Sequence, residues 1–318
     1  MFDVVIALYN KAPFIERTIE SVVAQSFCDW RLYVVDDGST DDSAQRVSRF
    51  TDPRISLIRQ KNAGVGLARN AGIAAGSAPW VAFLDADDVW TPDHLAELDK
   101  LRDAYPDAAL IGTAVTRFSG SPPAADASHG HFRISRYFHE MARGRPPLYT
   151  SSAAISRKAL ERWGVFKPLN GNEDVELWAR LAVAGNVAVS TRGTVFYRLD
   201  TGGITDQDDR QKTLKGPMRR EDMSSTIPTL DELLPTINDP RLRRDILEYI
   251  DSRVGVHMVK AVRYGHIAYA RHCRTLIVGK PRGQARIAAL LASLPPVVSR
   301  SIVAAAIGAK RAIRGQGR

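Results

Sequence analysis

The chain has 318 residues, 44% of them hydrophobic and 25% charged, so it can bury one large core and still carry an appendage. Its two cysteines are too few for a disulfide framework, and it has no run of 18 apolar residues that would predict a transmembrane helix. The net charge of +9 is unevenly placed, because residues 252–318 carry 13 Lys and Arg and no acid, whereas residues 1–251 carry 31 basic and 35 acidic residues.

Short apolar runs alternate with amphipathic segments through residue 104, which predicts an α/β fold with a parallel sheet. The predicted elements up to that point are strand 3–8, helix 12–25, strand 31–36, helix 40–50, strand 55–59, helix 64–75, strand 79–84 and helix 92–104. In the first helix we expect one face to pack on the core. The residues of that face are Phe14, Thr18, Ile19, Val22 and Val23.

The pattern becomes less regular further along the chain. The elements predicted there are strand 108–112, helix 156–163, helix 174–184, strand 187–191 and strand 194–199. Residues 117–147 lack periodicity, which indicates a binding loop or a partly disordered segment. From about residue 206 the pattern is mainly helical, so we divide the chain into an α/β domain over residues 1–205 and a basic, helical C-terminal region over residues 206–318.

The most informative motif places three carboxylates, Asp85, Asp87 and Asp88, directly after the apolar strand 79–84. Ligands of open α/β sheets bind where the strands end. Acids this close together repel one another unless a cation lies among them, and a hard divalent ion that holds a phosphate is a common solution. The alternative is a strand-end turn that also caps the helix starting near Thr91.

The three earlier strands end in a similar way. They lead into the polar or glycine-containing stretches Tyr9–Asn10, Asp36–Asp41 and Asn62–Asn70. Right-handed crossovers bring the ends of such strands to the same edge of the sheet. We therefore expect all four loops to contribute to one site.

These four motifs, followed by the acidic segment Asn172–Leu181, have an order and spacing that resemble the family 2 glycosyltransferases of the GT-A fold. The resemblance covers roughly residues 2–205. It implies a nucleotide-sugar-binding sheet flanked by helices, and an inverting transfer of a sugar from a nucleotide-diphosphate sugar to a hydroxyl of a saccharide or lipid-linked acceptor. It also implies bacterial surface-polysaccharide assembly, with a UDP-sugar as the favoured donor.

The resemblance assigns the donor side as follows. Ala7 and Tyr9 are expected to line the base pocket, and Asp37 to accept a hydrogen bond from the base or the ribose. Arg69 is expected to approach the base or the diphosphate. The alternative, a surface arginine on a helix, is disfavoured because Arg69 follows the Gly64-Val65-Gly66 turn. Asp85 is best placed for a ribose hydroxyl.

Asp87 is the predicted metal ligand. A Mg²⁺ or Mn²⁺ ion that contacts one or two carboxylates offsets the charge of a departing diphosphate. Asp88 is expected to orient its neighbours or to cap the following helix.

On the acceptor side, Asp174 is the predicted general base, because a carboxylate within hydrogen-bond reach accepts the proton of an attacking sugar hydroxyl. Glu173 is expected to position the acceptor. Both acids could instead stabilise the start of a helix through its dipole. Trp178 lies four residues after Asp174, on the same helix face, and is assigned to the acceptor site with a core position as the equal alternative.

Two positions depart from the family pattern. Ala7 stands where the family usually has a proline, which is expected to change only the stiffness of the backbone. Asp200 stands where many relatives carry a histidine that contacts the diphosphate or the metal, which puts a third metal ligand in doubt.

Other functional classes fit the motifs less well. A nucleotidyltransferase would carry a glycine-rich, basic loop after its first strand, and a dehydrogenase would carry Gly-x-Gly-x-x-Gly there. A non-catalytic nucleotide-sugar-binding protein is the third alternative, opposed by the presence of Asp37, Asp87 and Asp174. We expect no nucleic-acid partner, because no zinc, homeodomain or RNP-type motif accompanies the basic tail.

We expect a cytoplasmic protein, because no signal peptide precedes the first strand and the cysteines, Cys28 and Cys273, are expected to be reduced. The tail is expected to attach to an anionic membrane surface, on the cytoplasmic face of the inner membrane, through two apolar stripes flanked by basic residues. The stripes are Ile287, Leu290, Leu291 and Leu294, then Val298, Ile302, Ala305 and Ala309. The alternatives are packing on the acidic α/β domain or against a second subunit.

Overall fold

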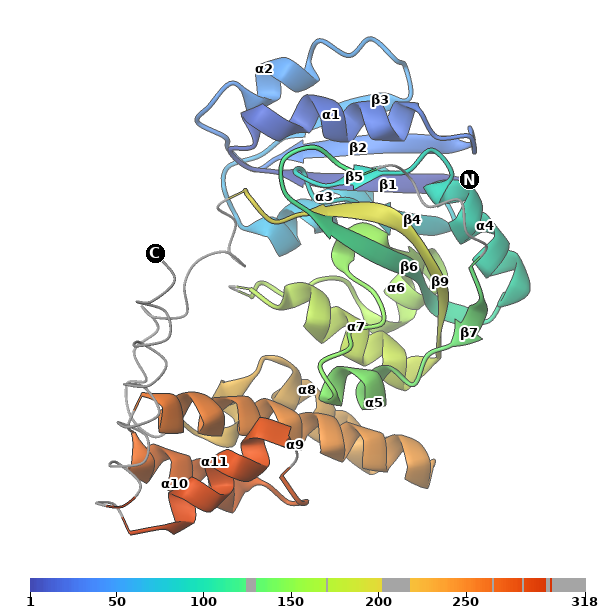
Figure 1. The fold of residues 1–318 in the computed structure, drawn as a ribbon. Coiled ribbons are helices and arrows are strands. Elements are labelled where there is room, and N and C mark those ends of the chain that lie inside the picture. Colours follow the sequence, from blue (N-terminus) through green and yellow to red (C-terminus); the bar gives the residue numbers. More distant parts are fainter. Residues whose placement is uncertain are drawn as a thin grey trace. The chain divides into compact units, whose positions relative to one another are not determined.

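The computed structural model describes residues 1–123, 130–169, 171–201, 218–264, 266–281, 283–295 and 298. The chain divides into two compact units (Figure 1). The sheet unit comprises Met1–Tyr137 and Pro146–Asp208, and the helical unit comprises Phe138–Arg145 and Asp209–Arg318. The predicted boundary after residue 205 lies outside the described residues, and the assignment of Phe138–Arg145 to the helical unit was not anticipated.

One mixed sheet forms the centre of the sheet unit. Its strands are β1 (Phe2–Leu8), β2 (Trp30–Asp36), β3 (Ile55–Arg59), β4 (Trp80–Phe83), β5 (Val89–Trp90), β6 (Ala108–Phe118), β7 (Phe132–Ile134), β8 (Ala153–Ser156) and β9 (Asn186–Arg198). The order within the described residues is β3-β2-β1-β4-β8-β6-β9-β5, with β7 paired to β9. The first four strands run parallel, as predicted, and β8 then pairs with β4 in the antiparallel sense.

The helices of the sheet unit cover the two faces of this sheet (Figure 1). They are α1 (Ala12–Val23), α2 (Ser43–Val47), α3 (Val65–Ala75), α4 (His94–Ala104), the 3₁₀ turn η1 (Thr150–Ser152), α6 (Arg157–Trp163) and α7 (Glu173–Ala184). The helix predicted over 40–50 is therefore shorter than expected. In the loop that precedes α2, the Asp41 carboxylate accepts hydrogen bonds from the backbone N–H groups of Ala12 and Ser43.

The two strands predicted over 187–191 and 194–199 are in fact one long strand, β9. The chain does not break at Gly193, because a shift in register between β6 and β9 absorbs the extra residues near Ala114. A glycine inside an apolar run marks such an irregularity as often as it marks a turn. The long strand carries Arg198 to the edge of the sheet where the acidic loop lies.

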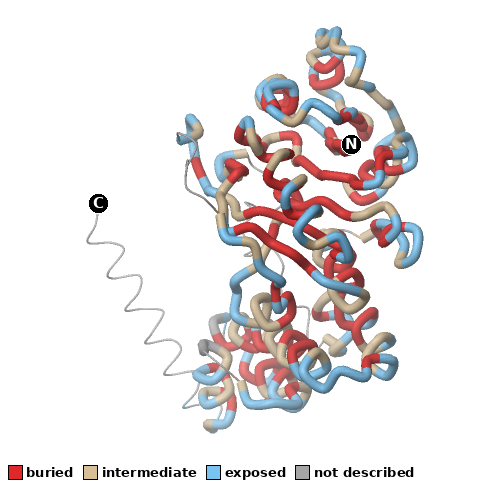
Figure 2. The backbone as a smooth tube through the Cα atoms, turned by 90° about the vertical axis from the view of Figure 1, so that its right-hand side faces the viewer, coloured by how far each residue is buried: buried red, intermediate tan, exposed pale blue. Residues whose placement is uncertain are grey.

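The core follows the alternation of side chains along the strands, and Figure 2 shows buried residues running along the sheet. On β1, Val4 and Ile6 belong to the same buried cluster as Ile15 and Ile19 of α1. Val5 points to the other face, where α3 approaches so closely that a Cβ on Gly72 would lie 2.5 Å from Val5 Cγ1. The sheet is thus covered on both faces, as a parallel sheet requires.

The predicted face of the first helix was partly wrong. Thr18, Ile19 and Val22 are buried as expected, but Val23 is exposed and Phe14 is only half-buried. Ile15 is fully buried in their place. Apolar residues extend over a wider arc of this helix than the sheet can cover, and periodicity alone does not say which flank of the arc faces inward.

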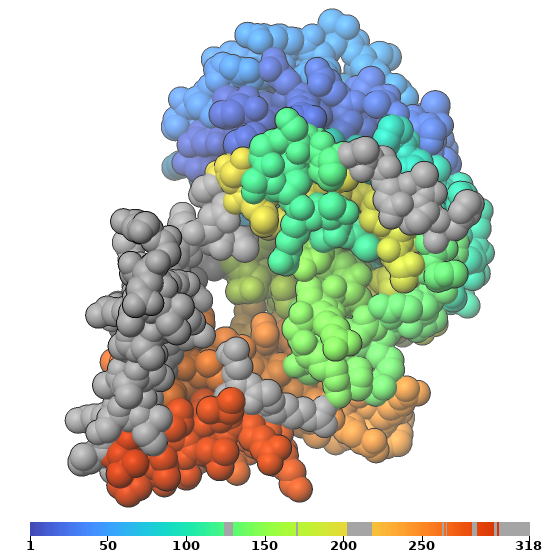
Figure 3. Space-filling view, in the orientation of Figure 1, coloured from blue at the N-terminus to red at the C-terminus, as the bar shows by residue number. Residues whose placement is uncertain are grey.

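The helical unit confirms the prediction of a mainly helical C-terminal region. Its elements are α5 (Tyr137–Ala142), η3 (Arg220–Met223), α8 (Thr226–Leu233), η4 (Leu234–Thr236), α9 (Pro240–Arg263), α10 (Ile267–Leu276) and α11 (Gly283–Ser293). Pro240 begins α9, and the Asp239 side chain accepts a hydrogen bond from the Arg241 N–H, which is a regular helix start. The helices α9, α10 and α11 pack against one another, and in Figure 3 the atoms of this unit are orange to red.

The last described helix, α11, packs through its small residues. Ala288 and Ala292 are buried, and Gly255 on α9 allows the Ala285 side chain to come close. Ile287 and Leu290, both from the predicted apolar stripe, are instead 62% exposed. None of the helices in the described ranges has the length and hydrophobicity needed to cross a bilayer.

Candidate active site

The three carboxylates of the acidic motif occupy the turn between β4 and β5, where the parallel strands end. The turn is fixed at both sides. The Leu84 N–H donates to the Val5 carbonyl over 3.1 Å, and the Asp85 N–H donates to Ser151 Oγ over 3.1 Å. The chain itself thus holds both ends of the turn, as a preorganised site requires.

Arg69 joins two of the predicted motifs. Its Nη2 lies 2.8 Å from Asp85 Oδ1, and its Nη1 lies 2.6 Å from Glu173 Oε1, 104 residues away along the chain. The guanidinium is buried and also lies over the Phe166 ring. Arg69 is therefore not a surface arginine, and the site it builds contains both the acidic turn and the start of α7.

The charges of this group stabilise one another. Burial alone would lower the pKa of Arg69, but the carboxylates of Asp85, Glu173 and Asp174 raise it above the ordinary value. Burial raises the pKa of Glu173 and of Asp85, and Arg69 opposes both shifts. Since Asp174 acts on the pKa values of Arg69, Asp85 and Glu173, its carboxylate lies within electrostatic reach of all three.

Asp87, the predicted metal ligand, already holds a cation. Lys11 Nζ donates to Asp87 Oδ2 over 2.6 Å, and the two side chains are only 20% and 16% exposed. Asp87 also contributes to the raised pKa of Asp85, so the two carboxylates repel each other. A carboxylate that binds an ammonium ion beside a second carboxylate fits a divalent cation. The residues present are therefore compatible with Mg²⁺ or Mn²⁺ held by Asp87.

Asp88 is buried and orients its surroundings. Its Oδ2 accepts a short hydrogen bond from Ser151 Oγ, and its Oδ1 accepts one from the Arg198 N–H over 2.9 Å. Burial, and then the charge of Asp85, raise its pKa well above the ordinary value. Its side chain makes no cap for α4, which begins at His94. Of its two expected roles, the contacts favour the orienting one.

Asp37 lies just past the end of β2, and its carboxylate is held by the loop after β3. Its Oδ1 accepts hydrogen bonds from Gln60 Nε2 and from the Ala63 N–H, both over 2.8 Å, and its Oδ2 accepts one from the Gly64 N–H over 2.9 Å. Each carboxylate oxygen accepts two hydrogen bonds, so Oδ2 keeps room for one ligand donor.

The first strand ends beside this loop. Ala7 is half-buried near the end of β1, and Tyr9, just past it, is 47% exposed. An exposed aromatic ring at a strand end suits stacking on a nucleobase. The assignment of both residues to the base pocket stays a prediction.

Asp174 lies in the first turn of α7, and its orientation is fixed. Its Oδ2 accepts a hydrogen bond from Thr150 Oγ1, and its Oδ1 accepts one from the Val175 N–H, both over 2.7 Å. Glu173 beside it is instead occupied by Arg69. The two acids thus have different partners. The pairing of Glu173 with Arg69 indicates that Glu173 has a positioning role. Both also lie where the helix dipole favours negative charge.

Trp178 is 2% exposed and packs against Phe83 and Phe166. The indole therefore lies in the core behind the site, which favours the core alternative. Its assignment to the acceptor site has no support from these contacts. The family-divergent Asp200 accepts hydrogen bonds from the Gly120 N–H and from Arg198 Nη1, which link the ends of β6 and β9.

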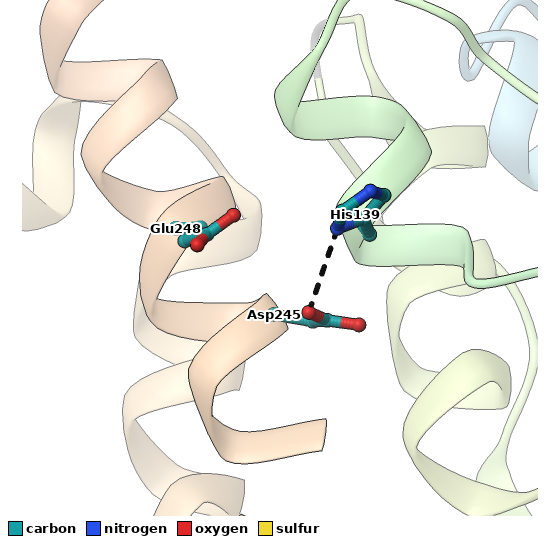
Figure 4. A group of neighbouring side chains, drawn as sticks. All are labelled: His139, Asp245 and Glu248. Carbon is teal, nitrogen blue, oxygen red and sulfur yellow. Dashed lines mark ion pairs between the residues drawn. The ribbon is translucent and has the colours of Figure 1, made fainter. Parts of the chain in front are cut away.

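A second group of potential metal ligands lies in the helical unit. Ligand atoms of His139 on α5 and of Asp245 and Glu248 on α9 all lie within 4.8 Å of one another (Figure 4). His139 Nδ1 lies 3.7 Å from Asp245 Oδ1, and Arg143 Nη1 lies 3.4 Å from Glu248 Oε2. Because Arg143 already balances Glu248, we interpret the group as polar contacts that join α5 to α9 and do not assign it to a metal.

The first half of the chain matches a known protein family. Residues 3–164 match the glycosyl transferase family 2. This chain belongs to glycosyl transferase family 2. The matched range contains the acidic turn, Asp37 and Arg69, and it ends before α7 begins.

Two curated proteins are similar to this chain. The succinoglycan biosynthesis protein ExoO of Rhizobium meliloti (strain 1021) is 32% identical over 225 residues, which cover 63% of this chain and 61% of ExoO. The UDP-Glc:α-D-GlcNAc-diphosphoundecaprenol β-1,3-glucosyltransferase WfaP of Escherichia coli is 26% identical over 217 residues, covering 64% of this chain and 80% of WfaP. The chain thus spans less than two thirds of the length of the first of these relatives.

Solved structures share the fold of this family 2 chain. S. aureus TarS 1-349 in complex with UDP-GlcNAc has a TM-score of 0.66 and 16% identity, and the match covers 91% of this chain and 87% of that one. The mannosyltransferase PcManGT from Pyrobaculum calidifontis, in complex with GDP-Man and Mn²⁺, has a TM-score of 0.58 and 19% identity, covering 98% and 79%. The fold is therefore the GT-A fold that the sequence predicted.

Three residues of the site had no predicted role. Lys11 binds Asp87, Thr150 binds Asp174, and Ser151 binds both Asp85 and Asp88. Lys11 directly follows the Tyr9–Asn10 turn, so its place in the chain was a signal that could have been used. Thr150 and Ser151 carry no such signal, since small hydroxyl residues are common in loops.

Proposed function

We propose that this chain is an inverting, metal-dependent glycosyltransferase. It transfers a sugar from a nucleotide-diphosphate sugar to a hydroxyl of a saccharide or lipid-linked acceptor. The observation that carries the proposal is the double contact of Arg69 with Asp85 and Glu173, because it joins the donor side to the start of α7, where the expected base Asp174 follows Glu173. Transfer of a sugar requires both groups together.

The donor side supplies binding and charge. Asp37 and Asp85 are placed to accept hydrogen bonds from the nucleoside, and Tyr9 to stack on the base. A divalent ion held by Asp87 would offset the negative charge of the departing diphosphate. Arg69 fixes the orientation of Asp85, so that the nucleoside is bound in one position.

The acceptor side supplies the base. Asp174 would accept the proton of the attacking hydroxyl, and the hydrogen bond from Thr150 Oγ1 to its Oδ2 orients the carboxylate. With one base and no second carboxylate assigned as a nucleophile, the hydroxyl attacks the anomeric carbon directly. A single displacement inverts the configuration at that carbon.

The substrates follow from the relatives. The name of WfaP states a UDP-Glc donor and a diphosphoundecaprenol-linked acceptor, and ExoO is named for succinoglycan biosynthesis. We therefore propose a UDP-sugar donor and a role in surface polysaccharide assembly at the cytoplasmic face of a membrane. PcManGT, whose structure is a complex with GDP-Man and Mn²⁺, supports Mn²⁺ as the ion to test first.

The proposal is tested by turnover of a panel of nucleotide sugars. Purified full-length chain is incubated with UDP-Glc, UDP-Gal, UDP-GlcNAc or GDP-Man, and release of the nucleoside diphosphate is measured with Mn²⁺ or with a chelator. We expect release from one UDP-sugar, and only with metal. Release of pyrophosphate from a nucleoside triphosphate and a sugar phosphate would instead identify a nucleotidyltransferase.

The metal ligand is tested in the same assay. Asp87→Asn should abolish turnover while leaving the fold intact, because it removes the charge that holds the cation. Asp103→Asn is the matched control, since Asp103 is 74% exposed on α4 and should retain full turnover. An Asp87→Asn variant with wild-type turnover after metal is restored would show that Asp87 is not the ligand.

The membrane-docking role of the tail is kept as part of this proposal. Ile287 and Leu290 on α11 face outward beside Arg286, which is also exposed, and no acid lies in residues 252–318 to repel anionic lipid. Each basic residue near an anionic surface contributes about 1 kcal/mol to binding. In the second predicted stripe Val298 is exposed, and its other residues lie outside the described ranges.

The docking test compares full-length chain with an Ile287→Ser, Leu290→Ser variant in vesicle co-sedimentation. We expect the wild type to bind anionic vesicles in preference to neutral ones, and the variant to bind less. Equal binding by the two proteins, or equal binding to both lipids, would contradict membrane docking. A dimer that dissociates in the variant would support the second-subunit alternative instead.

A further inference from the structure

Lys11 occupies the position at Asp87 where the proposed function requires a metal ion. Its ammonium group lies 2.6 Å from Asp87 Oδ2, a short, charge-assisted contact between two largely shielded side chains. A divalent ion that binds Asp87 must compete with this ammonium for the same carboxylate. The ion pair therefore conflicts with the assigned role of Asp87 unless Lys11 can move away.

The position of Lys11 in the fold permits that movement. The residue stands between β1 and α1, and its backbone N–H is fixed by Ser43 Oγ at 2.9 Å. Among the described residues, its side chain contacts only Asp87 and, more distantly, the Phe14 ring. The ammonium can therefore leave Asp87 without a change in the backbone. Because the backbone stays fixed, the released ammonium remains within reach of any ligand that binds at Asp87.

The electrostatics give the released ammonium a new partner. Asp85, Asp87 and Asp88 place three carboxylates in one turn between β4 and β5, so an anionic diphosphate is repelled unless cations are added. Arg69 is already committed to Asp85 and Glu173. A lysine that transfers from Asp87 to the diphosphate adds positive charge to the ligand at the step in which the metal neutralises Asp87.

We infer that Lys11 is an exchangeable cation, which holds Asp87 before the donor binds and contacts the diphosphate once a divalent ion has displaced it. This inference rests on the proposed function and adds a donor-binding residue to it. Lys11 neutralises Asp87 in the empty site and prevents tight binding of free metal without nucleotide. The metal and the diphosphate thereby enter the site as a pair.

The exchange is tested by two equilibrium measurements on full-length protein, neither of which requires turnover. Mn²⁺ is titrated without nucleotide and followed by electron paramagnetic resonance, and UDP is titrated in the presence of Mn²⁺ by calorimetry. The variant is Lys11→Met, with Lys61→Met as the control, because Lys61 is an exposed lysine on the loop that holds Asp37. Thermal melting checks that each variant is folded. If Lys11→Met does not fold, Lys11→Gln is used in its place.

We expect Lys11→Met to bind free Mn²⁺ about tenfold more tightly than the wild type, because a competing charge has been removed from a shielded carboxylate. The same variant should bind UDP about tenfold more weakly and uridine with unchanged affinity, since only the diphosphate loses a contact. Lys61→Met should match the wild type in every titration. In an Asp87→Asn background, Lys11→Met should no longer alter Mn²⁺ binding.

The titrations distinguish failure of the Lys11 exchange from failure of the proposed function. If wild-type protein binds both Mn²⁺ and UDP but Lys11→Met equals Lys61→Met in either affinity, the exchange role of Lys11 is wrong and the proposed function is untouched. If the wild type binds neither Mn²⁺ nor UDP, the proposed function fails, and the inference fails with it.

Discussion

Asp174 is the residue in which the proposed chemistry and the local structure agree most directly. Its carboxylate is fixed by Thr150 on one oxygen and by the Val175 N–H on the other. A base that is already oriented loses little conformational freedom when the acceptor binds. The neighbouring Glu173 is less suited to act as the base, because its carboxylate is paired with Arg69.

Asp174→Asn should therefore lower the transfer rate by about 10²–10⁴-fold, the usual range for a lost general base. UDP affinity should stay near that of the wild type, because the donor is held by other residues. Thr150→Val keeps the carboxylate but removes its partner, so its rate should fall less. The measurement is turnover together with UDP calorimetry, and weak UDP binding with an undiminished rate would place Asp174 on the donor side.

His94 gives a prediction about stability. Its ring is buried against Trp90 with Nδ1 2.7 Å from Thr194 Oγ1, and burial lowers its pKa from 6.5 to about 3. The unfolded chain binds a proton at this histidine below about pH 6.5, whereas the folded chain does not until about pH 3. Stability is therefore complete above pH 6.5 and falls as the pH is lowered, by on the order of 1 kcal/mol per unit.

The His94→Gln variant isolates that contribution. We expect the wild type to lose about 2 kcal/mol more than the variant in free energy of unfolding between pH 7 and pH 5. Urea denaturation at both pH values measures the difference. An equal loss in the two proteins would mean that His94 is protonated in the folded state.

At the scale of elements, α3 lies very close to β1. A Cβ on Gly72 would lie 2.5 Å from Val5 Cγ1, far inside van der Waals contact, in a close-packed core. α3 also carries Arg69, so this contact sets the distance of the guanidinium from the strand ends.

Gly72→Ala should destabilise the fold by about 1–3 kcal/mol, the range for an overpacked core. The matched control is Gly185→Ala, where the added Cβ would meet Ala109 at an ordinary 3.5 Å and φ is extended at −171°. The control should change stability by less than about 0.5 kcal/mol. Urea denaturation measures the free energy of unfolding of both variants. Equal stability of the two would show that α3 can shift on the sheet.

The alternating pattern predicted these elements well where each was bounded by clear signals. The first four strands and the helices α3 and α7 begin and end within one or two residues of their predicted positions. The pattern failed where a choice depended on partners distant in the sequence. Ile15 replaced Val23 in the core, and β9 continued through Gly193, because contacts with the sheet decided both. The same holds for the site. Its motif residues were predicted from the sequence, but their partners Lys11, Thr150 and Ser151 were not, because they come from distant parts of the chain.

At the scale of the whole molecule, the division into two units does not follow the chain order. Phe138–Arg145 lies between strands of the sheet unit in sequence but belongs to the helical unit. Phe138 is buried there and packs against Tyr249 of α9, with ring centroids 5.7 Å apart. A cut after residue 205, at the boundary that the sequence suggested, removes that partner.

We therefore expect a chain that ends at residue 205 to expose Phe138 and to bind a hydrophobic dye that the full chain does not bind. Phe138→Ser in the shortened chain should reduce the dye binding, because it removes the exposed ring. Dye fluorescence and sedimentation compare the three proteins. A shortened chain that is as soluble and as dye-free as the full one would restore the predicted boundary.

The central claim is that the acidic turn, Arg69 and Asp174 form one nucleotide-sugar transferase site that depends on a metal. Calorimetric titration of UDP into the full-length chain, with and without Mn²⁺, tests it most directly. We expect the wild type to bind UDP at least about tenfold more tightly with Mn²⁺ than without it, and Asp87→Asn to bind UDP equally in both conditions. UDP binding of equal strength with and without Mn²⁺, or no binding of UDP at all, would contradict it.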